Sequence, residues 1–309
     1  MNFKRLRYFA KVVDVGSLTQ AADLLHVAQP ALSQQIVTLE AEVHQQLLVR
    51  TKRGVIPTEA GKTLYRHAQL ILRQCEQARL DMAADSLGVA GPVSIGLAPG
   101  TAASLLAVPL IRAVRSSHPG ILLYLNENYG TALSELIMNG RMDLAVLYGN
   151  RAVHGLTFLP LLQEELFLVG PSNAAGPVAL SELAGVELFL PRQYNVVRKL
   201  VDDALARVGV VPRVGAEVES AITLKALVQA GLGATVLPAS MAREVAGENT
   251  DWCRRIVEPV IEAPLTLCQS DHLPLSEPAE VVRTVVLNLV AELAANRSWL
   301  PDGGGPAAP

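Results

Sequence analysis

Residues 17–36 read SLTQAADLLHVAQPALSQQI and predict two short helices joined by a tight turn. Ser17 is a residue type that caps a helix N-terminus, and Gln20 stands three positions later, where a capping box has its second partner. We place the turn near residues 26–28. Pro30 fits the first turn of the next helix, because the N–H that proline lacks would be unpaired there in any case. This pattern is typical of a helix-turn-helix, which lays its second helix in the major groove of DNA.

The second of these helices has one apolar face and one small, uncharged face. Apolar side chains recur at spacings of four, three and four residues, at Leu32, Ile36, Leu39 and Val43. This spacing places them on one buried helical face. We expect DNA contacts from the other side and from the preceding cap, namely Gln29, Pro30, Ala31, Ser33, Gln34, Val37 and Ser17. Glutamine can pair with adenine and small apolar groups can touch the thymine methyl, but an ordinary amphipathic surface helix has the same periodicity.

The next stretch, residues 47–58, reads LLVRTKRGVIPT and predicts two short strands around a basic tip that ends at Gly54. A basic hairpin beside a helix-turn-helix is a wing. We expect its charged side chains to neutralise phosphates, through Arg50, Lys52 and Arg53. A solvated loop would also account for three charges, but their position directly after the helical pair favours the wing.

Composition separates a basic N-terminal part from an acidic remainder. The chain has 309 residues and a net charge of −3, with nine Lys and Arg against five Asp and Glu in residues 1–67. This split fits one nucleic-acid-binding domain joined to a domain with another task. No signal peptide or membrane span is expected, so we predict a cytoplasmic protein. Cys75, Cys253 and Cys268 are widely spaced, and we predict reduced thiols, no metal and no cofactor.

Residues 59–87 predict one long helix with a narrow apolar stripe. Its apolar and small side chains follow spacings of four and three residues, at Leu64, Ala68, Ile71, Cys75, Ala78 and Met82. Such a seam is typical of helices that pair between subunits. The alternative is a helix packed on its own domain, which needs a wider stripe than the flanking charged and amide side chains leave.

The rest of the chain alternates short apolar strands with helical patterns from residue 93 to residue 296. We expect strands at 93–97, 121–127, 143–148, 165–169, 186–190, 214–218, 233–237 and 263–269, and helices at 101–116, 131–139, 195–208, 221–230 and 277–296. This alternation predicts an α/β fold with a parallel sheet. Its length fits two subdomains with a cleft between them.

Four motifs in residues 3–61 resemble the N-terminal domain of LysR-type transcriptional regulators. They are LRYF at 6–9, GSLTQAA at 16–22, QPALS at 29–33 and TEAG at 58–61. The chain departs from the usual family pattern at Ala28, where a capping Ser or Thr is common, at Gln34, where a basic residue is common, and at His44, where Gly is common. The missing cap costs about 1 kcal/mol in typical helices.

The resemblance implies a domain plan and a set of partners. It implies a winged helix-turn-helix at 1–58 and a dimerisation helix at 59–87. It implies next an effector domain resembling periplasmic binding proteins, with a first subdomain at 88–160 and 268–297 and a second at 161–267. The last residues, 298–309, are expected to form a flexible tail. It also implies that a homodimer or tetramer binds double-stranded DNA and acts on RNA polymerase. The stretches QQLLVRTKRGVIPTEAGK and ILRQCEQA match one family member more closely. That match implies activation and repression of nitrogen-assimilation genes under nitrogen limitation.

Polar residues at predicted helix starts are candidates for binding an effector. We single out Thr101, Ser104, Asn128, Thr131, Ser220 and Thr223, because helix N-termini bind anions through their N–H groups. Helix capping alone would also explain them. The first-subdomain loops contain no Arg or Lys, so we expect a weakly polar cleft and weak or absent effector control. The alternative is a cytosolic metabolite sensor of the same family with a different effector and regulon.

No enzyme motif stands out. The six histidines have no metal-ligand spacing, and no Walker loop, Gly-x-Ser-x-Gly elbow or HExxH motif is present. Gly231-Leu232-Gly233 follows a predicted helix and enters a strand, whereas a dinucleotide fingerprint needs the opposite order. We therefore expect a regulator without catalytic activity.

Overall fold

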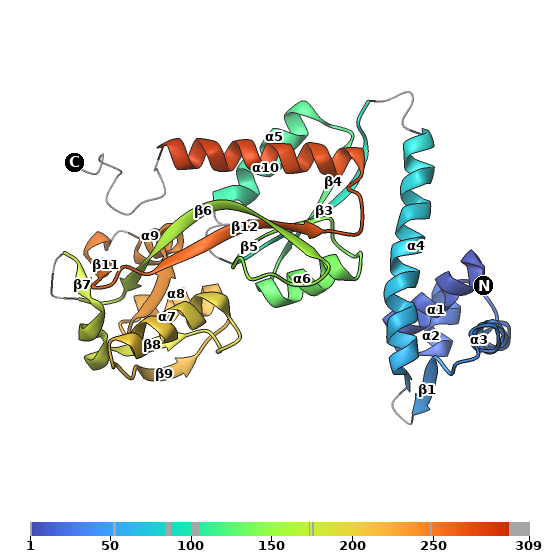
Figure 1. The fold of residues 1–309 in the computed structure, drawn as a ribbon, viewed down its shortest axis with the longest axis horizontal. Helices are drawn as coiled ribbons and strands as arrows, with labels where there is room; N and C mark the ends of the chain where they lie inside the picture. The colour runs from blue at the N-terminus through green and yellow to red at the C-terminus, as the bar shows by residue number, and fades with distance from the viewer. Residues whose placement is uncertain are drawn as a thin grey trace. The chain divides into compact units, whose positions relative to one another are not determined.

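The computed structural model describes residues 2–51, 54–83, 88–99, 105–172, 174, 176–247 and 249–296. It divides into two compact units (Figure 1). The first is Met1–Gly88 with Met138–Arg141, and the second is Val89–Ile137 with Met142–Pro309.

The N-terminal unit is a winged helix-turn-helix followed by a long helix. Its elements are α1 (Phe3–Val15), α2 (Leu18–Leu24), α3 (Gln29–Val43), β1 (Leu48–Thr51), β2 (Gly54–Pro57) and α4 (Glu59–Ala83). Ser17 caps α2 by accepting a hydrogen bond from the Gln20 N–H, as predicted. The structure also confirms that Ala28 gives α3 no side-chain cap, and it shows His44 in a left-handed conformation directly after the helix.

The core of this unit forms where the three short helices and the hairpin meet. Leu32, Ile36 and Leu39 are buried there, as the spacing predicted, and they pack in a cluster that includes Phe9 and Leu47. The hairpin strands β1 and β2 pair antiparallel. The Val55 N–H in β2 also donates to the Gly16 carbonyl after α1, over 2.8 Å. The hairpin is therefore tied to the helical core by backbone as well as by side chains.

The second unit is built on a mixed eight-stranded sheet. Its first half contains β3 (Gly91–Leu97), α5 (Ala107–Ser117), β4 (Ile121–Glu127), α6 (Gly130–Met138), β5 (Leu144–Tyr148) and α10 (Glu277–Asn296). Strand β3 pairs in parallel with β4 and β5. Figure 1 shows α5 and α10 on one side of these strands and α6 on the other. This half is an α/β layer structure, as predicted.

Two long strands connect the halves of this unit. Strand β6 (Leu156–Val169) and strand β12 (Glu262–Ser270) pair antiparallel along most of their lengths, and β12 also pairs antiparallel with β5. The sheet is therefore mixed, and the predicted parallel pairing holds only for β3, β4 and β5 in this part of it. The strand predicted at 165–169 begins at Leu156 instead. Both predicted subdomain borders, after residues 160 and 267, fall inside these strands.

The second half lies around the far end of β6. It contains β7 (Val178–Ala179), η3 (Leu180–Gly185), β8 (Glu187–Leu190), α7 (Val196–Arg207), β9 (Arg213–Glu217), α8 (Ala221–Gln229), β10 (Thr235–Pro238), α9 (Ala239–Ala246), η4 (Thr250–Trp252) and β11 (Cys253–Val257). Strand β10 pairs with residues 166–169 of β6, and β11 pairs with residues 167–169. Five short elements were not predicted, because they are too short to show a clear apolar period: β7, η3, α9, η4 and β11.

Candidate DNA-binding surface and ligand cleft

The exposed face of α3 carries the residues predicted to read DNA. Pro30, Ala31 and Gln34 are exposed, and the Val37 side chain is 49% exposed on the same helix. Gln29 and Ser33 are half-buried. Because the opposite face packs into the core, α3 presents these side chains outward in one row. Small apolar and amide groups in such a row match the adenine and thymine edges of the major groove.

The wing is linked directly to this helix. Arg50 in β1 donates a hydrogen bond from Nη2 to Oγ of Ser33 in α3, over 2.8 Å. Arg50 was predicted only as a phosphate contact, and its bond to Ser33 was not predicted. Lys52 and Arg53, the other predicted wing contacts, lie outside the described residues. Ser17 remains a candidate contact, although its hydroxyl already serves the α2 cap.

Two further residues position α3, and neither was predicted from the sequence. Arg5 in α1 donates to Gln35 over 3.0 Å and forms an ion pair with Glu42. The Glu40 carboxylate accepts from the backbone N–H groups of Leu47 and Leu48, over 2.8 and 3.1 Å. These contacts hold the recognition helix against the neighbouring helix and strand. No local sequence signal reveals them, because each joins residues separated by a loop or a helix.

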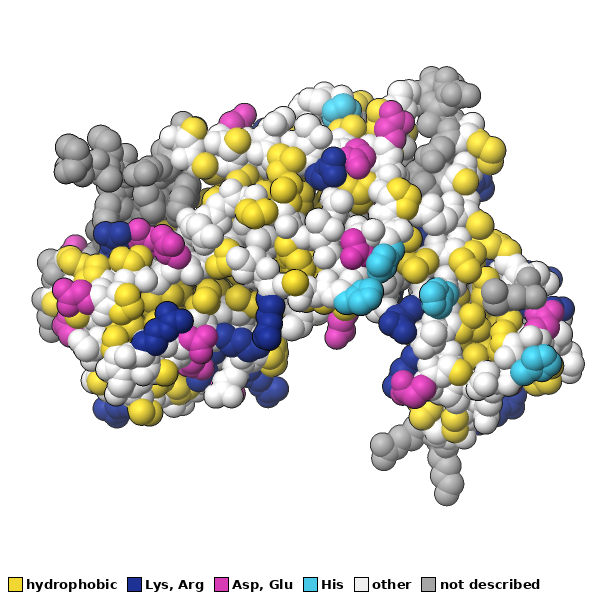
Figure 2. Space-filling view, in the orientation of Figure 1, with side chains coloured by type: hydrophobic (Ala, Val, Ile, Leu, Met, Phe, Trp, Pro, Cys, Tyr) yellow, Lys and Arg dark blue, Asp and Glu magenta, His cyan; other side chains and the backbone are white. Residues whose placement is uncertain are grey.

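The predicted dimerisation seam on α4 has a buried first part and an exposed second part. Leu64 packs on the core of its own unit, and Ala68 is fully buried within the chain. Farther along, Ile71 is 38% and Met82 76% exposed, and Cys75 and Ala78 are also exposed. Figure 2 shows hydrophobic side chains on the surface along this helix. The later half of the seam is therefore the part available to another chain.

A cleft of about 750 Å³, a volume that includes open solvent, lies in the second unit. Its lining includes Tyr129 and Thr131 from the first half and Tyr194, Glu219 and Ser220 from the second. Of the predicted effector contacts, Thr131 and Ser220 line the cleft. Asn128 and Thr223 are not among the lining residues, and Thr101 and Ser104 lie outside the described part of the chain.

Backbone N–H groups at two helix starts beside the cleft already have partners. Ser220 caps α8 by accepting from the Thr223 N–H. Asn195 caps α7 by accepting from two backbone N–H groups. These N–H groups are the ones that helix N-termini offer to anions. The capping interpretation of Ser220 therefore holds in this structure.

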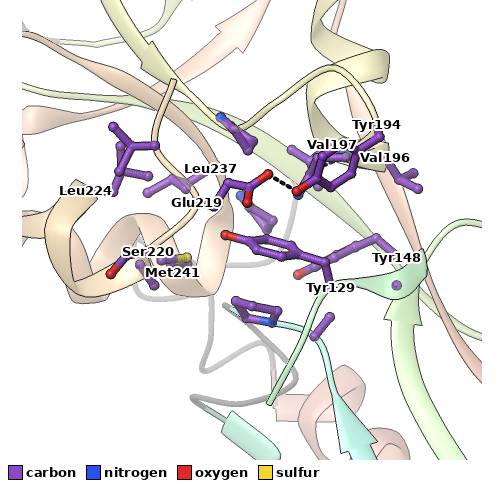
Figure 3. A pocket seen from close by; sticks show the side chains of 18 of the residues that line it. Tyr129, Tyr148, Tyr194, Val196, Val197, Glu219, Ser220, Leu224, Leu237 and Met241 are labelled. Atoms are coloured by element: carbon purple, nitrogen blue, oxygen red, sulfur yellow. Dashed lines mark hydrogen bonds between the residues drawn. The ribbon is translucent and has the colours of Figure 1, made fainter. Parts of the chain in front are cut away.

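Aromatic and acidic groups that the sequence analysis did not select dominate the polar part of the cleft (Figure 3). The Tyr194 hydroxyl donates to the Glu219 carboxylate. Burial, followed by the charge of Glu219, raises the pKa of the Tyr129 phenol to about 12. The Tyr148 hydroxyl donates over 3.0 Å to Glu164, a fully buried carboxyl group. These residues are scattered from position 129 to position 219, so no local motif could have identified them.

The structure brings no metal-binding cluster together in the part of the chain that it describes. No group of three or more His, Cys, Asp and Glu side chains is placed to hold a metal ion there. His154 and His272, separate in sequence, do approach with ring centroids 5.8 Å apart.

None of the helices among the described residues combines the length and apolar character needed to cross a bilayer.

A winged helix-turn-helix with an exposed recognition face, followed by a two-part α/β body with a cleft, defines a DNA-binding transcriptional regulator. Family models agree with both parts. The bacterial regulatory helix-turn-helix of the lysR family matches residues 3–62, and the LysR substrate binding domain matches residues 86–291. The chain belongs to the LysR family of transcriptional regulators.

Relatives cover nearly the whole chain. The nitrogen assimilation regulatory protein nac of Klebsiella aerogenes is 50% identical over 292 residues, covering 94% of this chain and 96% of that protein. The protein of the same name from Escherichia coli K12 is 46% identical over 301 residues, covering 97% and 99%.

Solved structures of full-length regulators share the fold. A full-length OxyR variant from Pseudomonas aeruginosa has a TM-score of 0.70 at 22% identity, covering 100% of this chain and 99% of that one. The LysR family regulator CbnR has a TM-score of 0.67 at 26% identity, covering 94% and 99%, and it has also been solved in complex with its target DNA.

Proposed function

We propose that this protein binds operator DNA as a homo-oligomer and regulates nitrogen-assimilation genes under nitrogen limitation, activating some and repressing others. The observation that carries the DNA-binding part is the exposed face of α3 beside the wing, with Arg50 placed against Ser33. The nitrogen role is supported by the identity of 50% and 46% to two nitrogen assimilation regulatory proteins over almost their full lengths.

The proposed partners follow from this arrangement. Two copies pair through the exposed half of the α4 seam, so that two recognition helices reach one operator. Whether the assembly is a dimer or a tetramer depends on further interfaces of the second unit. At activated promoters the bound protein contacts RNA polymerase. In this proposal acidic co-inducers exert weak or no control, because caps occupy the helix N-termini at Asn195 and Ser220.

The test is a genome-wide DNA-occupancy measurement in nitrogen-limited and nitrogen-replete cells, followed by footprinting of the bound sites. We expect nitrogen-assimilation promoters among those occupied. Occupancy of unrelated promoters that changes with another metabolite would favour the alternative, a sensor with a different effector and regulon. Footprints recorded with and without that metabolite separate the two.

Two substitutions test the assignment of DNA contacts. Gln34→Ala should cost about 1–3 kcal/mol of base discrimination at one position in each half-site. Arg53→Gln should weaken binding to all sequences equally and lower the salt slope by about one. An unchanged base preference in Gln34→Ala would mean that α3 does not read DNA through this face.

A further inference from the structure

The cleft of the second unit contains one carboxylate and several aromatic rings, and no Lys, Arg or His is among its lining residues in the described part of the chain. The rings are those of Tyr129, Tyr148 and Tyr194, and the carboxylate is that of Glu219. The charged group that the described lining presents to a ligand is therefore negative.

The groups around this carboxylate converge on one point. Figure 3 shows the Tyr129 hydroxyl directed toward Glu219 from one side and Tyr194 approaching it from the other. The Tyr194 hydroxyl donates a hydrogen bond to the Glu219 carboxylate, so the ring of Tyr194 is held beside that negative charge. Leu224, Leu237 and Met241 line the cleft and supply apolar surface for the rest of a ligand.

The cleft offers an anion no positively charged side chain among its described lining residues. At the start of α7, Asn195 accepts from the Val197 and Arg198 N–H groups, and at the start of α8, Ser220 accepts from the Thr223 N–H group. The buried guanidinium of Arg198, on α7, donates to Asp202 and to the Pro191 carbonyl, and its side chain does not line the cleft. A carboxylate or phosphate would therefore lose its hydration beside Glu219 without gaining a donor of opposite charge.

We propose that this cleft selects a small organic cation, an amine or quaternary ammonium group on an apolar body, over an anion of similar shape. Tyrosine rings attract ammonium groups through their negative faces, and a carboxylate adds direct charge attraction. The proposal rests on the proposed function only in treating the cleft as the regulator's ligand site. It revises the sequence-based expectation of weak effector control. That expectation was based on the first-subdomain loops alone and did not include Tyr148, Tyr194 or Glu219.

Three probes of similar shape but different charge test this directly. Calorimetry with the full-length protein compares choline, its neutral carbon isostere 3,3-dimethylbutan-1-ol, and the anion 3,3-dimethylbutanoate. We expect choline to bind at least about tenfold more tightly than the neutral isostere, and the anion to give no detectable heat. Equal binding of choline and the alcohol, no binding of choline, or preference for the anion would each overturn the proposal.

Variants assign the selectivity to the named groups. Glu219→Gln should weaken choline binding about tenfold and leave the neutral isostere unchanged, because only the charge is removed. Tyr129→Phe keeps the ring and should retain choline binding, whereas Tyr129→Leu should lose it. Glu135→Gln, an exposed substitution on α6 outside the cleft lining, is the matched control. If Glu219→Gln does not fold, the Tyr129 pair still decides the outcome.

The result is independent of the DNA experiments. Calorimetry needs no operator, so failure of choline to bind leaves the DNA-binding proposal intact. Conversely, absence of nitrogen-assimilation promoters from the occupancy map leaves the preference of the cleft for cations measurable.

Discussion

Arg50 in the wing and Ser33 in the recognition helix are joined by a hydrogen bond of 2.8 Å from Nη2 to Oγ. Ser33 lies in the first half of α3 and is half-buried, at the border between the core residues Leu32 and Ile36 and the exposed face. The contact therefore places a cation of the wing beside the groups expected to meet base edges. It also fixes the rotamer of the serine hydroxyl, which would otherwise rotate freely.

Arg50→Lys should relax sequence preference more than it weakens binding overall. Lysine keeps the charge for phosphates but lacks the planar fork that reaches Ser33. One such hydrogen bond is worth about 1 kcal/mol, so the ratio of specific to non-specific affinity should fall roughly fivefold. Fluorescence anisotropy on operator and random duplexes over a salt series measures both quantities. The salt slope should stay unchanged, because the number of neutralised phosphates is the same.

The matched control is Ser33→Ala, alone and combined with Arg50→Lys. If the two residues act as a pair, the effect of the double variant is smaller than the sum of the single effects. Additive effects would show that Arg50 and Ser33 contribute to specificity separately.

Gly54→Ala should destabilise the N-terminal unit. Gly54 has a φ of 126°, and an added Cβ would lie 2.5 Å from the Gly16 carbonyl oxygen, a backbone atom that accepts from Val55. Because neither the dihedral nor the contact suits a side chain, we expect a loss of about 2 kcal/mol. Thermal denaturation followed by circular dichroism measures it. Gly185→Ala, where a Cβ meets nothing within 4 Å, should leave the melting curve unchanged.

Ile71→Glu should weaken subunit assembly. Ile71 lies on α4 just beyond the residues that pack on their own unit, and its side chain is 38% exposed. Burying a carboxylate in an apolar seam should cost about 3 kcal/mol, roughly 100-fold in association. Sedimentation equilibrium measures the assembled mass. Gln74→Glu adds the same charge to an exposed position outside the seam and should assemble normally, and equal masses for both variants would exclude this part of α4 from the interface.

The thiols should differ sharply in reactivity. Cys75 is exposed, whereas Cys268 in β12 is fully buried, and burial raises the pKa of its thiol to about 12. Because the thiolate is the reactive form, Ellman's reagent at about pH 8 should label Cys268 only after unfolding. Cys75 should be labelled quickly in the monomer and slowly once α4 pairs with another copy, and Cys75→Ser should remove the fast phase of the monomer. Rapid labelling of Cys268 in the folded protein would contradict its placement.

The same shift links stability to alkaline pH. The folded state keeps the Cys268 proton over a range in which the unfolded chain loses it, since the pKa rises from 9.0 to about 12 on folding. The stabilising contribution is therefore complete below about pH 9 and declines as the pH rises toward about 12. Urea denaturation of the wild type and of Cys268→Ala across this range measures the difference.

Local patterns predicted the N-terminal unit well. The cap at Ser17, the missing side-chain cap at Ala28, and the buried face at Leu32, Ile36 and Leu39 were all visible in the sequence and are confirmed. Each depends on neighbours within a few residues, where helix period and capping chemistry are strong signals. The Arg50 contact with Ser33 escaped the same reasoning, because it joins a strand to a helix 17 residues away.

The strands of the second unit were mostly predicted, but their pairing was not. Strands alternating with helices suggested a parallel sheet, whereas β12 is antiparallel to both β5 and β6. The spacing of apolar residues reveals that a segment is extended and which of its faces is buried. It carries no information on whether the neighbouring strand runs parallel or antiparallel. The length of β6 was hidden because its first half alternates weakly, with exposed residues at Leu159 and Gln163.

By itself, the sequence determined the classes of element and the presence of a DNA-reading helix, because capping, helical period and charge segregation are properties of short stretches. Only the tertiary structure decided which half of the α4 seam is exposed, that Arg50 meets Ser33, and that Tyr129, Tyr194 and Glu219 line one cleft. The physical reason is that such contacts depend on how distant elements pack, and packing is set by the whole core rather than by any single segment.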